Sequence, residues 1–336
     1  MSRKTNHPAG AVSRHFITSE AIANNRLGED LTRIVDVYVP AGHDGKDLPL
    51  LVDLVGYTAG GPAHTAWKSF GENLPERLDR LIGDGTLPPC VVAFPDCFTR
   101  MGGNQYINSA AMGNWADFIT GEVVPMVEAE FSCGGDGRRG VFGKSSGGYG
   151  AMVHALLYPD FWAGAICHSG DMGFDLIMAA DFAHTLRRIA KHGGTIESFI
   201  AAFESADKPA GDDMHALMIL CDAATYDPDP EAFLGIRLPV TMDTCELIPE
   251  RWANWMKWDP LSLVKIHGEG LSRLKGLFID CGDIDQYNLL YGARRMTREL
   301  TNQGIAHEYA EFPDTHSGVD YRMEISLPWL VKRLNS

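Results

Sequence analysis

The sequence predicts an α/β fold in which helices cover both faces of a mostly parallel central sheet. Short apolar runs such as VVAF, GVF and GAICHS alternate with longer segments of helical length. Glycine or proline follows each run, as is typical of buried strands that end in tight turns. The alternation lapses once, so we expect a core formed by residues 1–170 and 262–336, with residues 171–261 as a cap-like insertion.

The first expected elements precede the middle of the chain. Residues 31–40 alternate apolar and polar side chains and predict an outer strand, whereas residues 48–57 form a denser apolar run that indicates a buried strand. We expect a helix around residues 70–82, a further strand at 89–96 and a helix near 115–130. The next strand contains GVF, and a helix over GYGAMVHALLY follows it.

The later elements frame the insertion. Within it, helical pieces are joined by Asp- and Pro-rich turns and by the tryptophan cluster WANWMKW. The alternation returns with a strand at 274–282, a helix around 289–303 and a strand at 307–312. A final amphipathic helix carries Trp329. The two strands after the insertion complete the expected sheet.

Composition limits the classes of partner. Of 336 residues, 45% are hydrophobic and 22% charged, which is enough apolar material for a packed core. The 29 Lys and Arg residues face 44 Asp and Glu residues, and the formal charge of −15 repels nucleic-acid backbones and anionic membranes. We therefore expect a small-molecule substrate, no nucleic-acid partner and no membrane partner. The sequence leaves a homo-oligomer open.

Location and redox state follow from what the chain lacks. No apolar run approaches the roughly 18 residues of a membrane helix, and the first residues carry no apolar leader, so we expect a cytoplasmic protein. Seven cysteines are scattered without a CxxC pair. This pattern favours reduced, buried thiols over a disulfide framework or a zinc site, and we expect neither a metal nor an organic cofactor.

The motif GKSSG, residues 143–147, carries the chemistry. It fits G-x-S-x-G and lies between an apolar strand and a helix, the context of a sharp turn that exposes a nucleophilic serine, here Ser145. The glycines give the chain room to reverse, and the helix N-terminus favours negative charge. A phosphate-binding G-x-x-x-x-G-K-S loop does not fit, because Arg138 stands where its first glycine belongs.

A serine nucleophile needs a base and an acid, which in this architecture follow it in the order acid, then histidine. Asp283 and Asp285 lie just past the strand LKGLFIDCG, and His316 lies in the loop FPDTHSG. Parallel sheets place functional groups at the C-terminal ends of strands, where all three lie. His168 competes as the base but precedes both acids, and Asp280 is expected to face along its own strand.

An oxyanion hole requires two backbone N–H donors. One is expected from Ser146, the residue after the nucleophile, and one from the loop VGYTAGG after the early buried strand. Tyr57 is the first choice for the second donor and Thr58 the next. The alternative is that VGYTAGG is simply a glycine-rich turn.

These residues resemble the putative-esterase family of α/β hydrolases, which includes S-formylglutathione hydrolases and tributyrin, feruloyl and enterochelin-type esterases. The resemblance is carried by RIVDVYVPAGHDGKDLPLLVDLVGY, VVAFPD, GGNQYINS, EVVP, GKSSGGYGAM, CGDID and PDTHSG. It implies an α/β-hydrolase fold over most of the chain except the insertion. It also implies Ser145 as nucleophile, Asp285 as acid and His316 as base, and so favours Asp285 over Asp283.

The chain departs from the family at two places. Val55-Gly56 stands where the family usually has His-Gly, and Ser146 replaces a frequent methionine. The GGNQYINS stretch resembles a segment on the acyl side of the site, so Tyr106 and Asn108 are candidate substrate contacts, with a surface loop as the alternative.

Two further residues have alternative interpretations. Trp255 in the insertion is a candidate substrate contact, although tryptophans at three-residue spacing are also typical of helix packing. Lys144 beside the serine either favours an anionic substrate or is merely solvated.

We therefore expect a serine esterase that forms a covalent acyl-enzyme on a small ester with a short or aromatic acyl group. Two alternatives stay open. An acyltransferase would use the same three residues, and a non-catalytic binding protein could be built on the same fold.

Overall fold

The computed structural model describes residues 6–336, so residues 1–5, which entered the argument about a leader, lie outside the described part. Its main sheet has eight strands in the order β1-β2-β4-β3-β7-β8-β9-β10. These are β1 (Ala11–Thr18), β2 (Thr32–Val39), β3 (Leu50–Leu54), β4 (Val91–Pro95), β7 (Arg139–Lys144), β8 (Gly164–His168), β9 (Gly276–Gly282) and β10 (Glu308–Phe312). From β4 to β10 every neighbouring pair is parallel, whereas β2 is antiparallel to both β1 and β4.

The strand over residues 31–40 is not the outer strand that we predicted. β1 pairs with all eight residues of β2 and takes the edge position. Most of β2 is buried, whereas the side chains of β1 are exposed or only partly buried. The alternation in the sequence of β2 therefore does not mark an edge, because β1 and β4 flank this strand.

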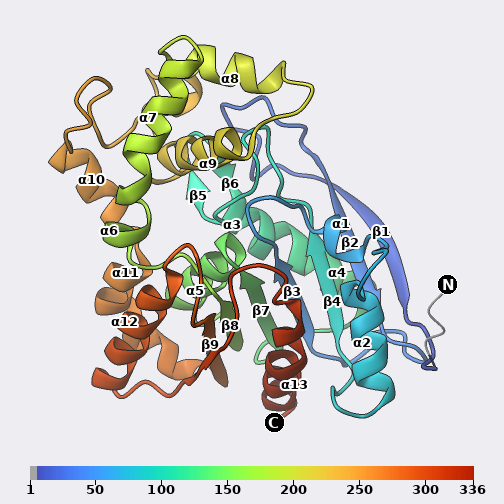
Figure 1. The fold of residues 1–336 in the computed structure, drawn as a ribbon. Helices are drawn as coiled ribbons and strands as arrows, with labels where there is room; N and C mark the ends of the chain where they lie inside the picture. The colour runs from blue at the N-terminus through green and yellow to red at the C-terminus, as the bar shows by residue number, and fades with distance from the viewer. Residues whose placement is uncertain (1–5) are drawn as a thin grey trace.

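Helices cover both faces of the sheet (Figure 1). One apolar layer joins the sheet to α2 (Leu74–Gly83) and α13 (Met323–Leu334). On the other face lie α3 (Trp115–Asp117), a π-helical turn (Phe118–Val123), α4 (Val124–Phe131), α5 (Ser146–Leu157), α11 (Pro260–His267) and α12 (Leu289–Asn302). The short helix α1 (Pro62–Thr65) and the small hairpin of β5 (Asn108–Ser109) and β6 (Gly113–Asn114) lie in the connections.

The chain between β8 and α11 contains helices but no strand of the main sheet. They are α6 (Phe174–Ile177), α7 (Phe182–Lys191), α8 (Ile196–Glu204), α9 (Gly211–Tyr226) and α10 (Pro249–Met256), with short 3-10 turns between them. α7, α8 and α9 lie together above the sheet in Figure 1. We refer to residues 171–261 as the cap, and this boundary remains a prediction.

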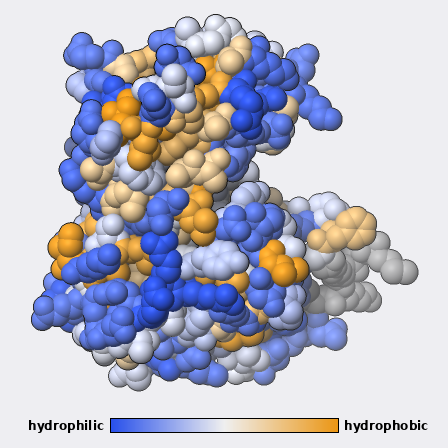
Figure 2. Space-filling view, turned by 60° about the vertical axis from the view of Figure 1, so that its left-hand side comes forward, coloured by the Kyte–Doolittle hydropathy of each residue, from blue (hydrophilic) through white to orange (hydrophobic). Residues whose placement is uncertain are grey.

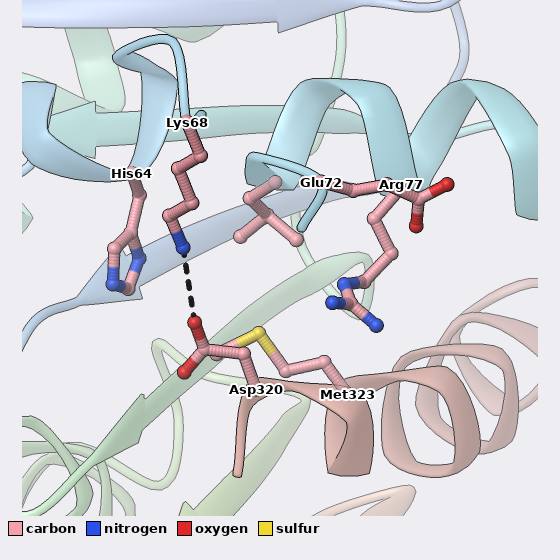
Figure 3. A pocket seen from close by; sticks show the side chains of 7 residues that line it. His64, Lys68, Glu72, Arg77, Asp320 and Met323 are labelled. Atoms are coloured by element: carbon pink, nitrogen blue, oxygen red, sulfur yellow. Dashed lines mark hydrogen bonds and ion pairs between the residues drawn. The ribbon is translucent and has the colours of Figure 1, made fainter. Parts of the chain in front are cut away.

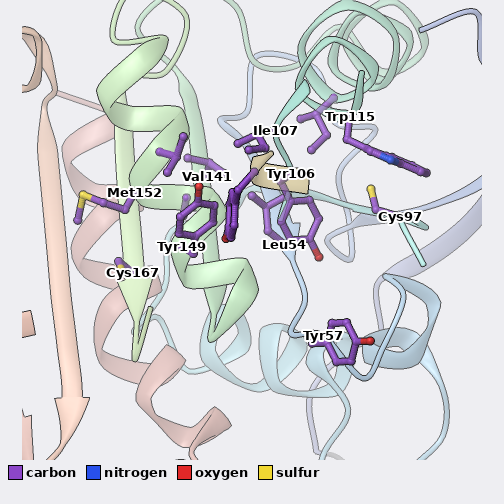
Figure 4. Close-up of a cluster of buried hydrophobic side chains, with 14 of the residues drawn as sticks. Leu54, Tyr57, Cys97, Tyr106, Ile107, Trp115, Val141, Tyr149, Met152 and Cys167 are labelled. Carbon is purple, nitrogen blue, oxygen red and sulfur yellow. The ribbon is translucent and has the colours of Figure 1, made fainter. Parts of the chain in front are cut away.

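The core fills the space between the sheet and its helices. Figure 4 shows part of it, with Tyr106, Tyr149 and Trp115 buried beside strand residues such as Val141. Six of the seven cysteines are buried, and Cys245 is partly exposed. Within residues 6–336, no helix combines the length and apolarity needed to cross a bilayer.

Candidate active site

Ser145 occupies a strained turn between β7 and α5. β7 ends at Lys144 and α5 begins at Ser146, so one residue makes the whole connection. Its backbone has φ 59° and ψ −126°, a conformation that a non-glycine residue rarely adopts. The Ser145 N–H donates a 3.0 Å hydrogen bond to the carbonyl oxygen of His168, which fixes the turn against β8. This is the geometry of the nucleophile turn predicted from GKSSG.

The two glycines of this turn are required by close packing. A Cβ atom on Gly147 would lie 1.7 Å from the carbonyl oxygen of Leu54, and one on Gly143 would lie 2.3 Å from the same atom. Both distances are far below van der Waals contact, so neither position tolerates a side chain without moving β3. The tight approach of β3 also brings Gly56 next to Ser145, where an added Cβ would lie 3.6 Å from the serine Cβ.

His316 and Asp285 are brought together by the loops after β10 and β9. His316 Nδ1 lies 2.8 Å from Asp285 Oδ2, and both residues are buried to more than nine-tenths. The other carboxylate oxygen accepts a 2.9 Å hydrogen bond from the Tyr287 N–H. The backbone N–H of His316 donates to Gln286 Oε1 at 3.0 Å, so adjoining residues of one loop hold both the carboxylate and the imidazole. Asp283 is exposed, and the imidazole is paired with Asp285 instead.

All three residues lie at one edge of the sheet. β7, β9 and β10 run in the same direction, and Ser145, Asp285 and His316 each follow the C-terminal end of one of them. Asp171, which follows β8, lies among them: it accepts a hydrogen bond from the Ser146 hydroxyl, and its pKa responds to the charges of both His316 and Asp285. The strand order therefore brings to one edge residues that lie up to 171 positions apart in the sequence.

The predicted oxyanion donors flank Ser145. Within the described residues, the backbone N–H groups of Ser146 and Tyr57 donate no hydrogen bond. The Tyr57 hydroxyl donates to the carbonyl oxygen of Met101 at 2.5 Å, and the Tyr106 hydroxyl donates to that of Val55 at 2.5 Å. These two bonds help to fix the loop after β3, together with the backbone bonds from the Ala59 and Gly61 N–H groups, and leave the Tyr57 N–H unused.

Sequence reasoning missed a buried acid cluster beside the turn. Ser146 Oγ lies 3.3 Å from Asp171 Oδ2 and accepts a 3.1 Å hydrogen bond from Gln105 Nε2. The same Gln105 amide donates to Asp222 Oδ1 at 3.0 Å. Burial raises the pKa of Asp171 to about 6, while His316 and the Ser146 hydrogen bond pull it down. Burial, and next the charge of Asp171, hold the pKa of Asp222 well above its ordinary value.

These residues are far apart in sequence. Gln105 precedes the turn, Asp171 follows β8, and Asp222 lies in α9. The single available signal was position, since Asp171 follows a parallel strand as the other site residues do.

His168 is part of a second, fully buried hydrogen-bonded set. Its Nδ1 lies 2.5 Å from Asp280 Oδ1, and its Nε2 lies 2.9 Å from the Ser326 hydroxyl in α13. The other oxygen of Asp280 accepts a 2.9 Å bond from Arg322 Nε. Ser326, His168 and Asp280 are 0%, 2% and 0% exposed. His168 therefore pairs with an acid, but not with Asp285.

The three candidate substrate contacts have different environments. Tyr106 is 1% exposed, with φ +60°, and supports the loop after β3 through its hydroxyl. Asn108 is partly buried in β5, and its side-chain oxygen accepts a hydrogen bond from the Asp117 N–H. Trp255 has no exposed surface and packs against Phe182 and Tyr226. The structure thus shows packing for Trp255, and a substrate contact for any of the three stays a prediction.

A small pocket lies beside α1 and α2 (Figure 3). His64 and Lys68 face Asp320 across it, and Lys68 Nζ is 3.1 Å from Asp320 Oδ2. His64 Nδ1 also lies 2.5 Å from the fully buried carboxylate of Asp53. The pocket holds about 10 Å³, enough for about one water molecule. It is too small for an ester. Burial raises the pKa of Asp320, but the positive charges of Lys68, His64 and Lys144 outweigh this effect and lower that pKa.

The mostly parallel sheet and the serine turn define an α/β hydrolase, as the sequence predicted. The chain belongs to the putative esterase family, whose model matches residues 25–326. The resemblance drawn from the sequence motifs is thereby confirmed.

Individual relatives are distant. The esterase Rv1288 of Mycobacterium tuberculosis is 26% identical over 262 residues, which cover 73% of this chain and 46% of that protein. This chain thus spans about half the length of the curated relatives it matches. A ferulic acid esterase has a similar structure, with a TM-score of 0.63 at 17% identity over 98% of this chain and all of the other. An S-formylglutathione hydrolase from Agrobacterium tumefaciens gives 0.58 at 19% identity over 99% of both.

Proposed function

We propose that this chain is a serine hydrolase that cleaves small carboxylic esters through an acyl-enzyme on Ser145. The observation that carries the proposal is the 2.8 Å bond between His316 Nδ1 and Asp285 Oδ2, at the sheet edge where Ser145 occupies its strained turn. An imidazole held by a carboxylate through Nδ1 has Nε2 free to take a proton.

The first half of the reaction forms the acyl-enzyme. Ser145 Oγ attacks the ester carbonyl carbon while its proton passes to His316 Nε2, and Asp285 stabilises the resulting imidazolium. The carbonyl oxygen becomes an oxyanion, which the N–H groups of Ser146 and Tyr57 bind. When the tetrahedral intermediate collapses, the carbon–oxygen bond to the alcohol breaks, and His316 returns its proton to the leaving oxygen.

The second half releases the acid. Water takes the place of the alcohol, gives a proton to His316 and attacks the acyl carbon, after which Ser145 Oγ leaves and recovers the proton. The scheme uses side chains and backbone of this chain alone. The ferulic acid esterase and S-formylglutathione hydrolases among the structural neighbours support an aromatic or short acyl group.

Acyl transfer would use the same intermediate, with an alcohol or thiol in place of water. Product analysis with and without a candidate acceptor alcohol separates the two: a hydrolase still releases mainly free acid when the acceptor is present. A new ester as the main product would instead support a transferase. The cytoplasmic location and the lack of nucleic-acid and membrane partners stay predictions.

A panel of esters tests the proposal. Wild type, Ser145→Ala and Ser205→Ala are assayed on esters that differ in acyl length and aromaticity. Ser205 is an exposed serine at the end of α8 in the cap and serves as the matched control. We expect hydrolysis by wild type and by Ser205→Ala, and none above background by Ser145→Ala. Equal activity of Ser145→Ala and wild type would refute the proposal.

A further inference from the structure

Tyr287 links the candidate base to the cap. Its ring meets the ring of His316 edge to face, with centroids 5.0 Å apart at 85°. It also lies nearly parallel to the ring of His215 in α9, at 6.4 Å and 15°. Its N–H holds Asp285, yet 47% of the residue is exposed. Tyr287 thus joins catalytic loop and cap and still offers a free surface.

The contact with His316 decides which part of an ester Tyr287 would meet. In the proposed reaction, His316 returns its proton to the leaving oxygen, so the alcohol must lie beside the imidazole. The oxyanion donors Ser146 and Tyr57 are on other elements, α5 and the loop after β3. A half-exposed side chain packed on the imidazole therefore borders the alcohol side of the ester and not the carbonyl oxygen.

Exposed apolar side chains occur close in sequence to Tyr287 and to its partner His215. On its own loop and the following helix, Ile284 is 65% and Tyr291 51% exposed. On the cap, Met214 adjoins His215 and is 41% exposed. Figure 2 shows a deep notch between the upper lobe, which contains the cap helices, and the lower lobe, with apolar side chains on the upper lobe next to it. Exposed apolar side chains on both the Tyr287 loop and the cap helix that meets it favour an apolar ligand.

Two basic side chains on the helices next to Tyr287, His215 and Arg295, are paired with carboxylates. His215 Nε2 lies 2.9 Å from Asp181 Oδ2, and this hydrogen bond raises the pKa of His215. Arg295 of α12 pairs with Asp175 of α6 at 2.8 Å. His215 and Arg295 are therefore each occupied by a carboxylate, whereas 47% of Tyr287 and 27% of the His215 side chain stay exposed.

We propose that Tyr287, with His215 opposite, forms a binding subsite for a flat apolar group on the alcohol part of the ester, such as a benzyl group. This inference rests on the proposed esterase function and adds the class of alcohol to it. Tyr287 acts as a specificity residue: an aromatic alcohol gains edge or face contacts with its ring while the acyl group sits on the other side of Ser145.

The experiment compares acetates of alcohols with similar leaving-group chemistry. The ratio of kcat/KM for benzyl acetate to that for ethyl acetate is measured with wild type, Tyr287→Ala, Tyr287→Phe and His215→Ala. Phe16→Ala is the matched control, because Phe16 is an exposed aromatic on β1 at the far edge of the sheet. Cyclohexylmethyl acetate separates a need for flatness from a need for bulk.

We expect wild type, Tyr287→Phe and Phe16→Ala to share a preference for the benzyl ester over both other esters. Tyr287→Ala should lower that ratio by about three- to tenfold, the size of one aromatic contact, and His215→Ala should lower it less. An unchanged ratio in Tyr287→Ala, or no benzyl preference in wild type, would overturn the subsite and leave the esterase function intact. Failure of wild type to hydrolyse any of the three esters would count against the proposed function itself.

Discussion

Two sets of Ser, His and Asp within residues 6–336 share their composition but differ in burial and in hydrogen bonding. In the buried set, Ser326, His168 and Asp280 are joined by hydrogen bonds of 2.9 and 2.5 Å and have almost no exposed surface. In the candidate active site, Ser145 is partly exposed on a strained turn, and only its proposed partners His316 and Asp285 are joined, at 2.8 Å.

Under the proposed function, reactivity lies with the set that is not a closed hydrogen-bonded triplet. Ser326 lies inside α13 with no exposed surface, and Arg322 pairs with Asp280. Ser145 lies at a helix start beside two unbonded amides. Access and positioned donors separate the two sets, so the buried set should contribute stability and the other activity.

The largest expected effect comes from replacing each of the two serines by alanine in turn. Ser145→Ala should lower kcat by on the order of 10⁴-fold or more, because it removes the nucleophile, with little change in melting temperature. Ser326→Ala should keep kcat within about threefold but lower stability by about 1–3 kcal/mol, since His168 Nε2 loses its buried partner. Ester turnover and thermal unfolding check both variants. A severe loss of kcat in a folded Ser326→Ala protein would break the comparison.

Replacing Asp285 should mainly lower activity, whereas replacing Asp280 should mainly lower stability. Asp285→Asn leaves the shape of the site but no longer stabilises the imidazolium, so kcat should fall by on the order of 10³- to 10⁴-fold. Asp280→Asn leaves the Arg322 guanidinium without its buried carboxylate and should lower stability by about 3–5 kcal/mol. Urea unfolding measured beside turnover tests this. Equal stability losses in the two variants would show that the Asp285 pair is structural as well.

The acid cluster predicts a pH effect on stability. Folding raises the pKa of Asp171 from 3.8 to about 6, so between these values the native state binds more protons than the unfolded state. The contribution of Asp171 to stability is therefore most favourable at low pH and is lost as the pH rises through about 6. Asp171→Asn should stabilise the protein relative to wild type at pH 8, by at most about 3 kcal/mol, and not at pH 4.

The measurement for Asp171 is the difference between the two unfolding free energies at several pH values. Taking the difference cancels the titration of the other carboxylates. The unfolding free energy of Asp171→Asn minus that of wild type should increase as the pH rises from 4 to 8. A difference that stayed constant or decreased would contradict the assignment.

The smallest expected effect is that of Tyr57→Phe. The proposed oxyanion donor is the backbone N–H, which the substitution keeps, so kcat should change by less than about fivefold. The lost bond to the Met101 carbonyl should lower stability by about 1 kcal/mol. A loss of activity as large as that of Ser145→Ala would show that the hydroxyl itself takes part.

Much of the fold was predictable because its signals are local. The runs at 48–57, 89–96 and 274–282 became β3, β4 and β9, since buried parallel strands are continuous apolar segments. β1 was missed because its side chains are exposed or partly buried and follow no clear apolar pattern. The edge position of a strand depends on which segment pairs with it, and local periodicity does not contain that information.

The site was predictable to the extent that chain order and strand ends define it. The pairing of His316 with Asp285, rather than with Asp283, agrees with the family pattern and depends on the turn after β9. The acid cluster was not predictable, because Gln105 meets Ser146 and Asp222 only through the tertiary arrangement of the cap and core. Tyr287 was hidden for the same reason, since its partner His215 lies in the cap.

The central claim is that Ser145, and not the better hydrogen-bonded Ser326, is the reactive serine. Treatment of the native protein with a fluorophosphonate, followed by mass-spectrometric mapping of the adduct, tests this most directly. The account predicts one covalent adduct per chain, located on Ser145 and absent from the His316→Ala protein. An adduct on another serine, or no adduct on the folded wild type, would contradict it.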